Sequence, residues 1–438
     1  MNYQESLQYL DELNKFGMKL GLGRIEKLVE AMDNPQLHYK TIHVTGTNGK
    51  GSVCSMLSSV LTRSGIKTGL YISPHLVSYT ERIQIDGCPI SEADFADCVS
   101  AVRVFADKMV EDGGESPTQF EVITAAAFLY FAINQVEYAV IEVGLGGLLD
   151  STNVVQPEIC VITNVTFEHA QYCGGTLEGI AHHKAGIIKD GVPVVTAAKG
   201  MPLDVIQQTA EEKNSDIFVA GSEFSSVFIR FDGEYQYLSF VSELLGISFE
   251  YKLKMLGDHQ VENSSLAIIT ACVLANSDER ITRQNIIEGL ASAKWPARFE
   301  VLNIKGQKIV IDGAHNPAGM KVLRHNLDKY YPEQNRVILL GILKDKDIDT
   351  MLKELLRKGD EVVITVPDSD RRADPDFIAG KIHDHHVETY SNMKDALDEA
   401  RFLARDGKLL CLTGSLYLTG ELRDIILHEN TDYTAVER

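Results

Sequence analysis

The residues that could most directly do chemistry lie in one short stretch, GTNGKGS at residues 46–52. Backbone N–H groups in such a glycine-rich turn can converge on an anion, and Lys50 adds a mobile positive charge. The Gly-x-x-Gly-Lys spacing is shorter than the usual Gly-x-x-x-x-Gly-Lys-Ser/Thr phosphate loop, so this is a variant of that motif. The stretch predicts binding of nucleotide phosphates, and the alternative is a glycine-rich turn that binds nothing.

A magnesium ion that accompanies nucleotide phosphates needs oxygen ligands. Gly51 stands where a phosphate loop normally carries a metal-binding hydroxyl, so other residues must supply them. Glu142 lies near the end of the apolar run YAVIEVG, a common position for a magnesium ligand, and His169 follows the next such run. A strand-end cap or salt bridge remains open for Glu142, and a hydrogen-bonded histidine for His169. The tract HDHH at residues 383–386 is predicted to be solvated surface.

These side chains must be brought together by a sheet. An apolar, β-branched run over residues 39–44 predicts a buried strand before the loop, and residues 49–63 place apolar side chains on one helical face after it. The runs YAVIEVG, EICVITNV and VPVVTAA predict further strands with helices between them, and another helix is expected over residues 120–134. This alternation predicts a mostly parallel sheet covered on both faces, with its chemistry beyond the carboxyl ends of the strands.

The pattern changes twice along the chain. Residues 216–256 contain two alternating runs around Asp232-Gly233, which predict an antiparallel hairpin appended to the first domain. After SAKWPARFEVL, the alternation of strands and helices restarts with QKIVIDGAHNPAG. We therefore expect an α/β fold with a P-loop-type, mostly parallel domain and a small antiparallel appendage, residues 1–297. A second, Rossmann-like α/β domain is expected over residues 298–438.

Composition narrows the classes of partner. The 438 residues include 62 acidic and 42 basic side chains, a formal charge of −20, and no basic run. This argues against nucleic-acid binding. The seven cysteines are scattered without a Cys-x-x-Cys pair, as in reduced intracellular proteins. The acidic, amphipathic N-terminus is unlike a signal peptide, and apolar runs are too short to cross a bilayer. We expect a cytoplasmic protein without membrane contact.

Together, the motifs carry a resemblance. The sequence resembles the folylpolyglutamate synthases and dihydrofolate synthases, a branch of the Mur ligase superfamily of ATP-dependent amide-forming enzymes. Ten segments in the expected order carry it: GTNGKGSV, YISPHLVSYTERIQIDG, TQFEVITAAAF, EVGLGGLLDSTN, KAGIIK, GDHQVENSSLA, WPARFE, DGAHNPAG, LKDKD and TGSLY. No single segment would be specific, whereas the ordered set is.

The resemblance implies site residues across the chain. It implies ATP contacts at Gly49, Lys50, Gly51, Ser52, Asn263, Arg298, Asp312 and His315. It implies ligands for two magnesium ions at Ser73, Glu142, His169 and a carboxylated Lys184. It implies pterin-side contacts at Thr118, Gln119, Phe120, Glu121, Leu149, Asp150 and Ser151. By this assignment Ser73 replaces the hydroxyl missing at Gly51, and Lys50, Lys184 and His169 are catalytic. For Glu121 an acid at a helix N-terminus is an open alternative.

The activity implied by the resemblance is acyl activation. ATP phosphorylates a substrate carboxylate, and the amine of L-glutamate displaces phosphate from the acyl phosphate. The substrates would be a reduced folate, or dihydropteroate in a second activity, and the protein would be a monomer. Two rivals remain: a peptidoglycan Mur ligase, for which the 45 residues before Gly46 leave no uridine-nucleotide domain, and a non-catalytic paralogue. The set of charged groups disfavours the second rival.

Four positions depart from the commoner family pattern. Leu148 stands where arginine is frequent, Glu168 replaces an aspartate, His183 a glutamate, and Ala297 a glycine. None is a proposed ATP or metal ligand, but Leu148 adjoins the pterin-side segment, so the pterin preference is open.

Lys184 poses an electrostatic problem in the implied site. An ammonium beside a divalent cation would be repelled where water is sparse. Addition of carbon dioxide to the neutral amine gives an anionic carbamate with two oxygens, which suits magnesium. The alternative is an ammonium turned toward a phosphate or the acyl group.

Overall fold

The computed structural model describes residues 1–14, 19–168 and 170–434. Two compact units divide the chain. The first comprises three pieces: Met1–Arg230, Gln236–Lys254 and Asp258–Lys294. The second also comprises three pieces: Phe231–Tyr235, Met255–Gly257 and Trp295–Arg438. The second unit therefore includes two short segments that precede its main part in the chain.

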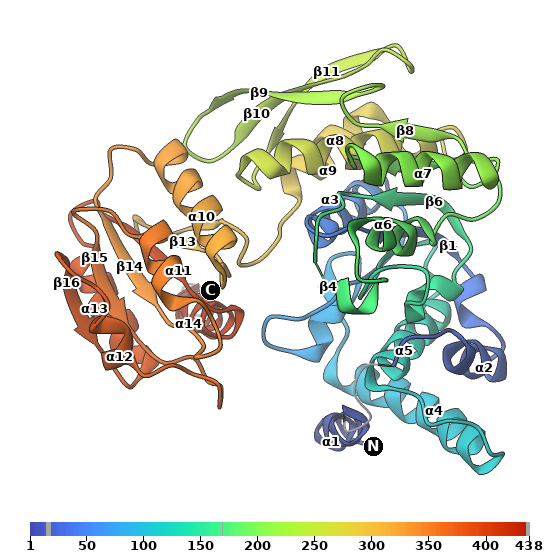
Figure 1. Ribbon diagram of the computed structural model, residues 1–438, viewed down its shortest axis with the longest axis horizontal. Helices are drawn as coiled ribbons and strands as arrows, with labels where there is room; N and C mark the ends of the chain where they lie inside the picture. The colour runs from blue at the N-terminus through green and yellow to red at the C-terminus, as the bar shows by residue number, and fades with distance from the viewer. Residues whose placement is uncertain (15–18, 169, 435–438) are drawn as a thin grey trace. The chain divides into compact units, whose positions relative to one another are not determined.

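The first unit is built on an eight-stranded sheet with the order β4-β3-β2-β5-β1-β6-β7-β8. Strands β1, β6 and β8 of this sheet are labelled in Figure 1. Its strands are β1 (Lys40–Thr45), β2 (Thr68–Tyr71), β3 (Ile83–Ile85), β4 (Cys88–Pro89), β5 (Tyr138–Glu142), β6 (Pro157–Ile162), β7 (Val194–Thr196) and β8 (Ile217–Val219). The strands from β2 to β8 in this order run parallel, whereas β3 and β4 are antiparallel. The predicted mostly parallel sheet is confirmed.

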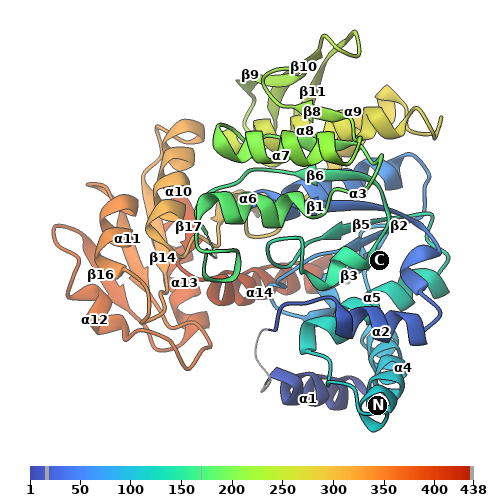
Figure 2. The same cartoon turned by 45° about the vertical axis from the view of Figure 1, so that its right-hand side comes forward.

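Helices cover both faces of this sheet (Figure 2). They are α1 (Tyr3–Leu13), α2 (Gly23–Ala31), α3 (Lys50–Arg63), α4 (Glu92–Glu111), α5 (Gln119–Ile133), α6 (Leu177–Ala185), α7 (Met201–Glu212), α8 (Asp258–Leu274) and α9 (Arg283–Ser292), with short 3₁₀ turns at Pro35–Leu37, Tyr79–Arg82, Ser151–Val154 and Ala170–Tyr172. Helices α3, α8 and α9 pack together. Ala139 and Ile141 of β5 join the apolar cluster of α1, α2, α4 and α5 on the other face. Because side chains alternate along a strand, Glu142 belongs to the face opposite Ile141.

Local sequence explains the helix that follows the loop. Gly49 is the N-cap of α3 with φ +89°, and Gly65 follows the helix with φ +73°, both in the left-handed region that glycine tolerates best. The apolar face predicted for residues 49–63 is confirmed, because its members are at most 1 % exposed: Val53, Met56, Leu57, Val60 and Leu61.

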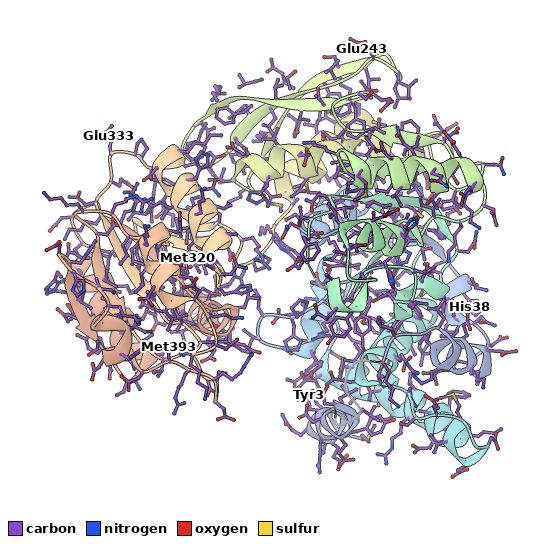
Figure 3. All side chains as sticks on the ribbon, viewed as in Figure 1. Tyr3, His38, Glu243, Met320, Glu333 and Met393 are labelled. Carbon is purple, nitrogen blue, oxygen red and sulfur yellow. The ribbon has the colours of Figure 1, made fainter. Side chains whose placement is uncertain are left out.

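A three-stranded sheet, β9 (Ser225–Phe231), β10 (Gln236–Ser242) and β11 (Ile247–Leu253), forms the predicted hairpin and its continuation. In the first turn, Asp232 Oδ1 accepts the N–H groups of Glu234 and Tyr235. Glu243 marks the turn between β10 and β11 in Figure 3. Within the second unit, Phe231 from the first turn packs edge-on against Tyr330, with ring centroids 5.0 Å apart.

The second unit contains a six-stranded sheet with the order β12-β13-β17-β14-β15-β16. The strands are β12 (Glu300–Ile304), β13 (Gln307–Ile311), β14 (Arg336–Leu340), β15 (Glu361–Ile364), β16 (His386–Thr389) and β17 (Leu409–Thr413). The helices are α10 (Pro317–Tyr330), α11 (Ile348–Leu355), α12 (Pro375–Ala379), α13 (Met393–Leu403) and α14 (Leu416–Thr434). All neighbouring strands pair in parallel except β12 with β13. The predicted second α/β fold is confirmed.

Two smaller predictions can also be compared with the structure. His383 and His386 are exposed but His385 is half-buried, so the solvated surface predicted for residues 383–386 is confirmed in part, and His386 begins strand β16. All seven cysteines are free thiols. In the described part of the chain, no helix is both long enough and apolar enough to cross a bilayer.

Candidate active site

The phosphate loop between β1 and α3 has no room for side chains at two glycines. Gly46 has φ +148°, and a Cβ there would lie 1.8 Å from Thr163 Oγ1. Gly49 has φ +89°, and a Cβ there would lie 2.4 Å from Asn263 Oδ1. Both contacts are far below the van der Waals distance, so the loop requires glycine at each position for space as well as for backbone conformation.

The segment after β6 holds this loop in shape. Thr163 Oγ1 donates to the carbonyl of Asn48 at 2.6 Å. Asn164 accepts the Asn48 N–H on its side-chain oxygen at 3.0 Å and the Thr47 N–H on its carbonyl at 2.8 Å. The loop is therefore fixed by bonds from the neighbouring strand end rather than by its own glycines alone.

Lys50 and Ser52 extend the loop into α3 with different environments. Lys50 is half-buried, and its Nζ donates to the carbonyls of Gly46 and Thr47 at 3.1 and 3.2 Å. Ser52 is 5 % exposed and accepts a hydrogen bond from Gln260 Nε2 at 3.1 Å. Gln260 Oε1 in turn accepts from Asn263 Nδ2. Ser52 and Asn263, both predicted as ATP contacts, thus belong to one buried network.

The residues predicted to bind magnesium are partly brought together. Glu142 is 4 % exposed, and its Oε2 accepts the backbone N–H of Ser73 at 3.1 Å. His169 lies outside the described residues. Among the residues that are described, no three His, Cys, Asp or Glu side chains gather into a metal cluster.

Lys184 lies near the end of α6 and is 5 % exposed. Within the described ranges, its Nζ has no hydrogen-bond acceptor. Burial, and then the positive charge of Lys50, lower the pKa of Lys184 to about 7, while Cys173 and Glu168 act in the opposite direction. The amine is thus available in its neutral, nucleophilic form near neutral pH. The same influence of Lys50 shows that the two lysines belong to one electrostatic environment.

The first pterin-side segment begins α5. Thr118 and Glu121 form a capping box, in which each side chain accepts the backbone N–H of the other residue. Glu121 is 1 % exposed, and both of its oxygens also lie 3.1 Å from Arg24 Nε. The open alternative for Glu121, an acid at a helix N-terminus, is confirmed. Gln119 is half-exposed and donates to the hydroxyl of Tyr79.

The second pterin-side segment follows the glycine-rich stretch after β5. Asp150 is 4 % exposed and accepts hydrogen bonds from the N–H groups of Leu145 and Thr152 and from the Thr152 hydroxyl. Burial raises the pKa of Asp150, and these bonds oppose that effect. A Cβ on Gly144 would lie 2.5 Å from Phe120 Cζ, so glycine lets the Phe120 ring approach this stretch.

The remaining two residues of this segment are placed by the backbone. The Leu149 carbonyl accepts the N–H of Gly21 at 3.4 Å. Ser151 is 8 % exposed and begins the 3₁₀ turn that Asp150 caps.

The three ATP contacts predicted in the second unit form a local group. Asp312 accepts the N–H groups of Phe299 and Ala314 at 2.8 and 2.9 Å. Burial raises the pKa of Asp312, whereas the positive charges of Arg298 and His315 lower it. His315 Nδ1 lies 2.8 Å from the carbonyl of Gly313.

Arg298 is exposed between two buried residues with left-handed backbone. Ala297 has φ +52° and is fully buried, and Phe299 has φ +47° and is 2 % exposed. The family's more frequent glycine at position 297 would adopt this conformation at lower cost. Here a buried methyl group occupies the position instead.

The other three departures lie around α6. Leu148 is 42 % exposed and donates its N–H to the carbonyl of His183 at 2.7 Å. A Cβ on Gly186 would lie 2.5 Å from Leu148 Cβ, so Leu148 lies directly against the helix end. Burial and the charge of Lys184 lower the pKa of His183. Glu168 is exposed.

Sequence reasoning missed the residues that support the site. Gln260 stands three positions before Asn263, a helical spacing inside the quoted segment GDHQVENSSLA, so this pair could have been found. Thr163 and Asn164 follow a predicted strand end. The distant partner of Glu121, Arg24, gives no signal in the sequence.

Comparison with known proteins identifies the family. Residues 44–271 match the Mur ligase middle domain, and residues 297–416 match the Mur ligase glutamate ligase domain. Folylpolyglutamate synthase of Lacticaseibacillus casei is 36 % identical over 98 % of this chain and 99 % of its own length. Dihydrofolate synthase/folylpolyglutamate synthase of Bacillus subtilis is 31 % identical over 96 % and 98 %.

A solved complex of folylpolyglutamate synthase with AMPPCP and folate is also similar. It covers 98 % of this chain and 100 % of its own, with 34 % identity and a TM-score of 0.80. Both domain matches and the relatives' near-complete coverage agree with the ordered motifs and with the loop described above. This chain therefore belongs to the folylpolyglutamate synthase and dihydrofolate synthase family of ATP-dependent Mur ligases.

Proposed function

We propose that this ligase joins the amine of L-glutamate to the carboxylate of a reduced folate at the expense of ATP. The observation that carries the proposal is that two lysines share one electrostatic environment: Lys50, on a loop with no room for a side chain at Gly46 or Gly49, and the buried Lys184. Lys50 is suited to bind a phosphate, and the amine of Lys184 is suited to modification to an anionic carbamate. The similar complex with AMPPCP and folate supports these two substrate classes.

The nucleotide would lie against the phosphate loop. There, Lys50 and the backbone N–H groups of Gly49, Gly51 and Ser52 would offset the negative charge that develops during phosphoryl transfer. The buried network through Gln260 would hold Asn263 against this loop. From the second unit, we propose that Arg298, Asp312 and His315 also contact ATP. Our assignment of the two domains to residues 1–297 and 298–438 is part of this proposal.

The donor atoms fit magnesium. Glu142 offers a buried carboxylate next to Ser73, and a carbamate on Lys184 would add two anionic oxygens. We assign Ser73, Glu142, carboxylated Lys184 and His169 as the residues that would hold two magnesium ions. When bound, magnesium would neutralise charge on the phosphates.

The reaction would then proceed in two steps. A folate carboxylate oxygen attacks the γ-phosphorus of ATP, which releases ADP and forms an acyl phosphate. The glutamate amine, after losing a proton, attacks the acyl carbon, and the C–O bond to phosphate breaks as the amide forms. The protein's task is to position these groups and exclude water.

On the folate side, some residues of the two pterin-side segments shape the site and others contact the substrate. Because Glu121 and Asp150 are buried and already hydrogen-bonded, we propose that they shape the site. Gln119 and Phe120 are only half-buried and are better placed to contact the substrate, together with the backbone of residues 149–151 and Thr118.

A product assay tests the proposal. The protein is incubated with ATP, magnesium and L-glutamate plus either a reduced folate or dihydropteroate, and products are identified by mass. A folate extended by one or more glutamate residues supports the proposal, and dihydrofolate from dihydropteroate adds the second activity. ATP-dependent product with neither acceptor present, or none with both, would contradict it. Light scattering of the same sample checks the proposed monomer.

A further inference from the structure

A buried hydrogen-bond chain runs from the central strand of the first sheet to the folate side of the proposed site. His43 of β1 is fully buried, and its Nε2 lies 2.9 Å from Thr152 Oγ1. Thr152 Oγ1 lies 2.6 Å from Asp150 Oδ1. Neither His43 nor Thr152 takes part in the proposed reaction.

The direction of this chain follows from the chemistry of its members. A carboxylate can only accept, so the hydroxyl proton of Thr152 is directed to Asp150. The oxygen of Thr152 must then accept from His43, which therefore carries its proton on Nε2. Burial and the charge of Lys189 lower the pKa of His43 to about 3, so the ring is neutral with one N–H. Its Nδ1 has no partner among the described residues, as expected for the unprotonated nitrogen.

At its Asp150 end, this series of hydrogen bonds holds the glycine-rich stretch after β5. Asp150 Oδ2 accepts the N–H of Leu145 at 2.8 Å. A Cβ on Gly144 would lie 3.1 Å from the same oxygen and 2.5 Å from the Phe120 ring. Asp150 and Phe120 therefore meet at a single glycine, so rotation of the carboxylate would disturb the backbone on which the Phe120 ring rests.

We propose that His43 and Thr152 are positioning residues that fix the Asp150 carboxylate, and through it the Gly144–Leu145 backbone and the Phe120 ring, for folate binding. This inference rests on the proposed function. The phosphate loop has its own supports in Thr163 and Asn164, so the effect should fall on the folate and not on ATP.

Thr152→Val removes the hydroxyl that links His43 to Asp150 while keeping the shape of the side chain. Because a hydrogen bond to a charged group is lost, KM for the folate should rise about tenfold or more. KM for ATP and kcat should stay within about twofold. Thr152→Ser keeps the hydroxyl and should restore the folate KM. The matched control is Thr41→Val, because Thr41 is also fully buried and its hydroxyl has no partner among the described residues.

Amide hydrogen exchange provides a second measurement that does not depend on the reaction. Thr152→Val should speed exchange in residues 144–150 and leave residues 46–52 unchanged, whereas Thr41→Val should change neither. His43→Phe removes the donor at the other end and should give the same pattern if Thr152→Val does not fold. If the wild-type protein makes no glutamylated product, the proposed function is wrong. Hydrogen exchange would still test whether His43 and Thr152 position residues 144–150. The proposed positioning role would be overturned if Thr152→Val left hydrogen exchange in residues 144–150 unchanged. It would also be overturned if the KM values for ATP and for folate rose equally.

Discussion

The phosphate loop and helix α6 each contribute one lysine to the proposed site, in opposite surroundings. Lys50 is half-buried and donates to two backbone carbonyls, which suits an ammonium. Lys184 is buried without an acceptor in the described part of the chain, and its pKa is lowered to about 7. The same side chain can therefore serve as a fixed cation or as a nucleophilic amine, and its surroundings decide which.

Removal of the cation should have the largest effect. Lys50→Ala should lower turnover about a thousandfold, because charge that develops on the transferred phosphoryl group loses its mobile counter-charge. The fold should persist because the side chain is only half-buried. Lys199→Ala is the matched control, since Lys199 is exposed and forms a surface ion pair with Glu262. Turnover is measured at saturating substrates, and wild-type turnover in Lys50→Ala would refute the assignment.

Loss of the Lys184 side chain should have a large effect on activity that small carboxylic acids partly reverse. Lys184→Ala should lower activity about a hundredfold, and small carboxylic acids should restore part of it by supplying an anionic oxygen. The same acids should not restore Lys50→Ala, because that variant lacks a cation. Rates are measured across an acetate and formate titration. A fully active Lys184→Ala would end the carbamate proposal, and an inactive variant that no acid restores would favour the ammonium.

The carbamate itself should depend on pH. With a pKa of about 7, the neutral fraction of Lys184 should increase about tenfold between pH 6 and pH 8. At fixed carbon dioxide pressure, the carbamate signal in ¹³C NMR should grow over this range and be absent from Lys184→Ala. Lys50→Ala should shift the rise to higher pH, because its charge helps to lower the pKa. A signal that is independent of pH, or that survives in Lys184→Ala, would contradict the prediction.

The smallest effect concerns stability. In buffer free of carbon dioxide, the folded protein disfavours the charged form of Lys184, because its folded pKa lies below its unfolded value. The cost is full below about pH 7 and falls as pH rises toward the unfolded pKa of 10.5. Lys184→Met should therefore raise the Tm by a few degrees at pH 6, and by less at pH 9. A difference in Tm between Lys184→Met and the wild-type protein that increases with pH would contradict this prediction.

Much of the fold followed from local patterns. The strand before the loop, the amphipathic helix after it and the hairpin at Asp232-Gly233 could be predicted because each depends on residues close in sequence. Strand β16 could not, because His386–Thr389 is short, polar and only partly buried, and it pairs at the edge of its sheet.

The site was less accessible to sequence reasoning. Lys50 could be recognised because glycines surround it in the chain. The low pKa of Lys184 could not be derived from its neighbours in sequence, because burial and the distant Lys50 cause it. Likewise, Asp150 and Glu121 carry charges that suggest ligand contacts, yet their partners Thr152 and Arg24 already occupy them. Sequence therefore locates the candidate groups, and packing determines what each is free to do.

The hairpin turn that belongs to the second unit has a consequence for the order of folding during synthesis. Phe231 leaves the ribosome long before Tyr330, its partner ring, has been made. The same holds for Gly257, whose N–H is donated to the Tyr330 hydroxyl. The first unit can collapse early, but these two segments must wait for α10. A nascent chain stalled before α10 would thus leave the Phe231 ring without its Tyr330 partner, and a fragment that starts at Trp295 would lack both segments.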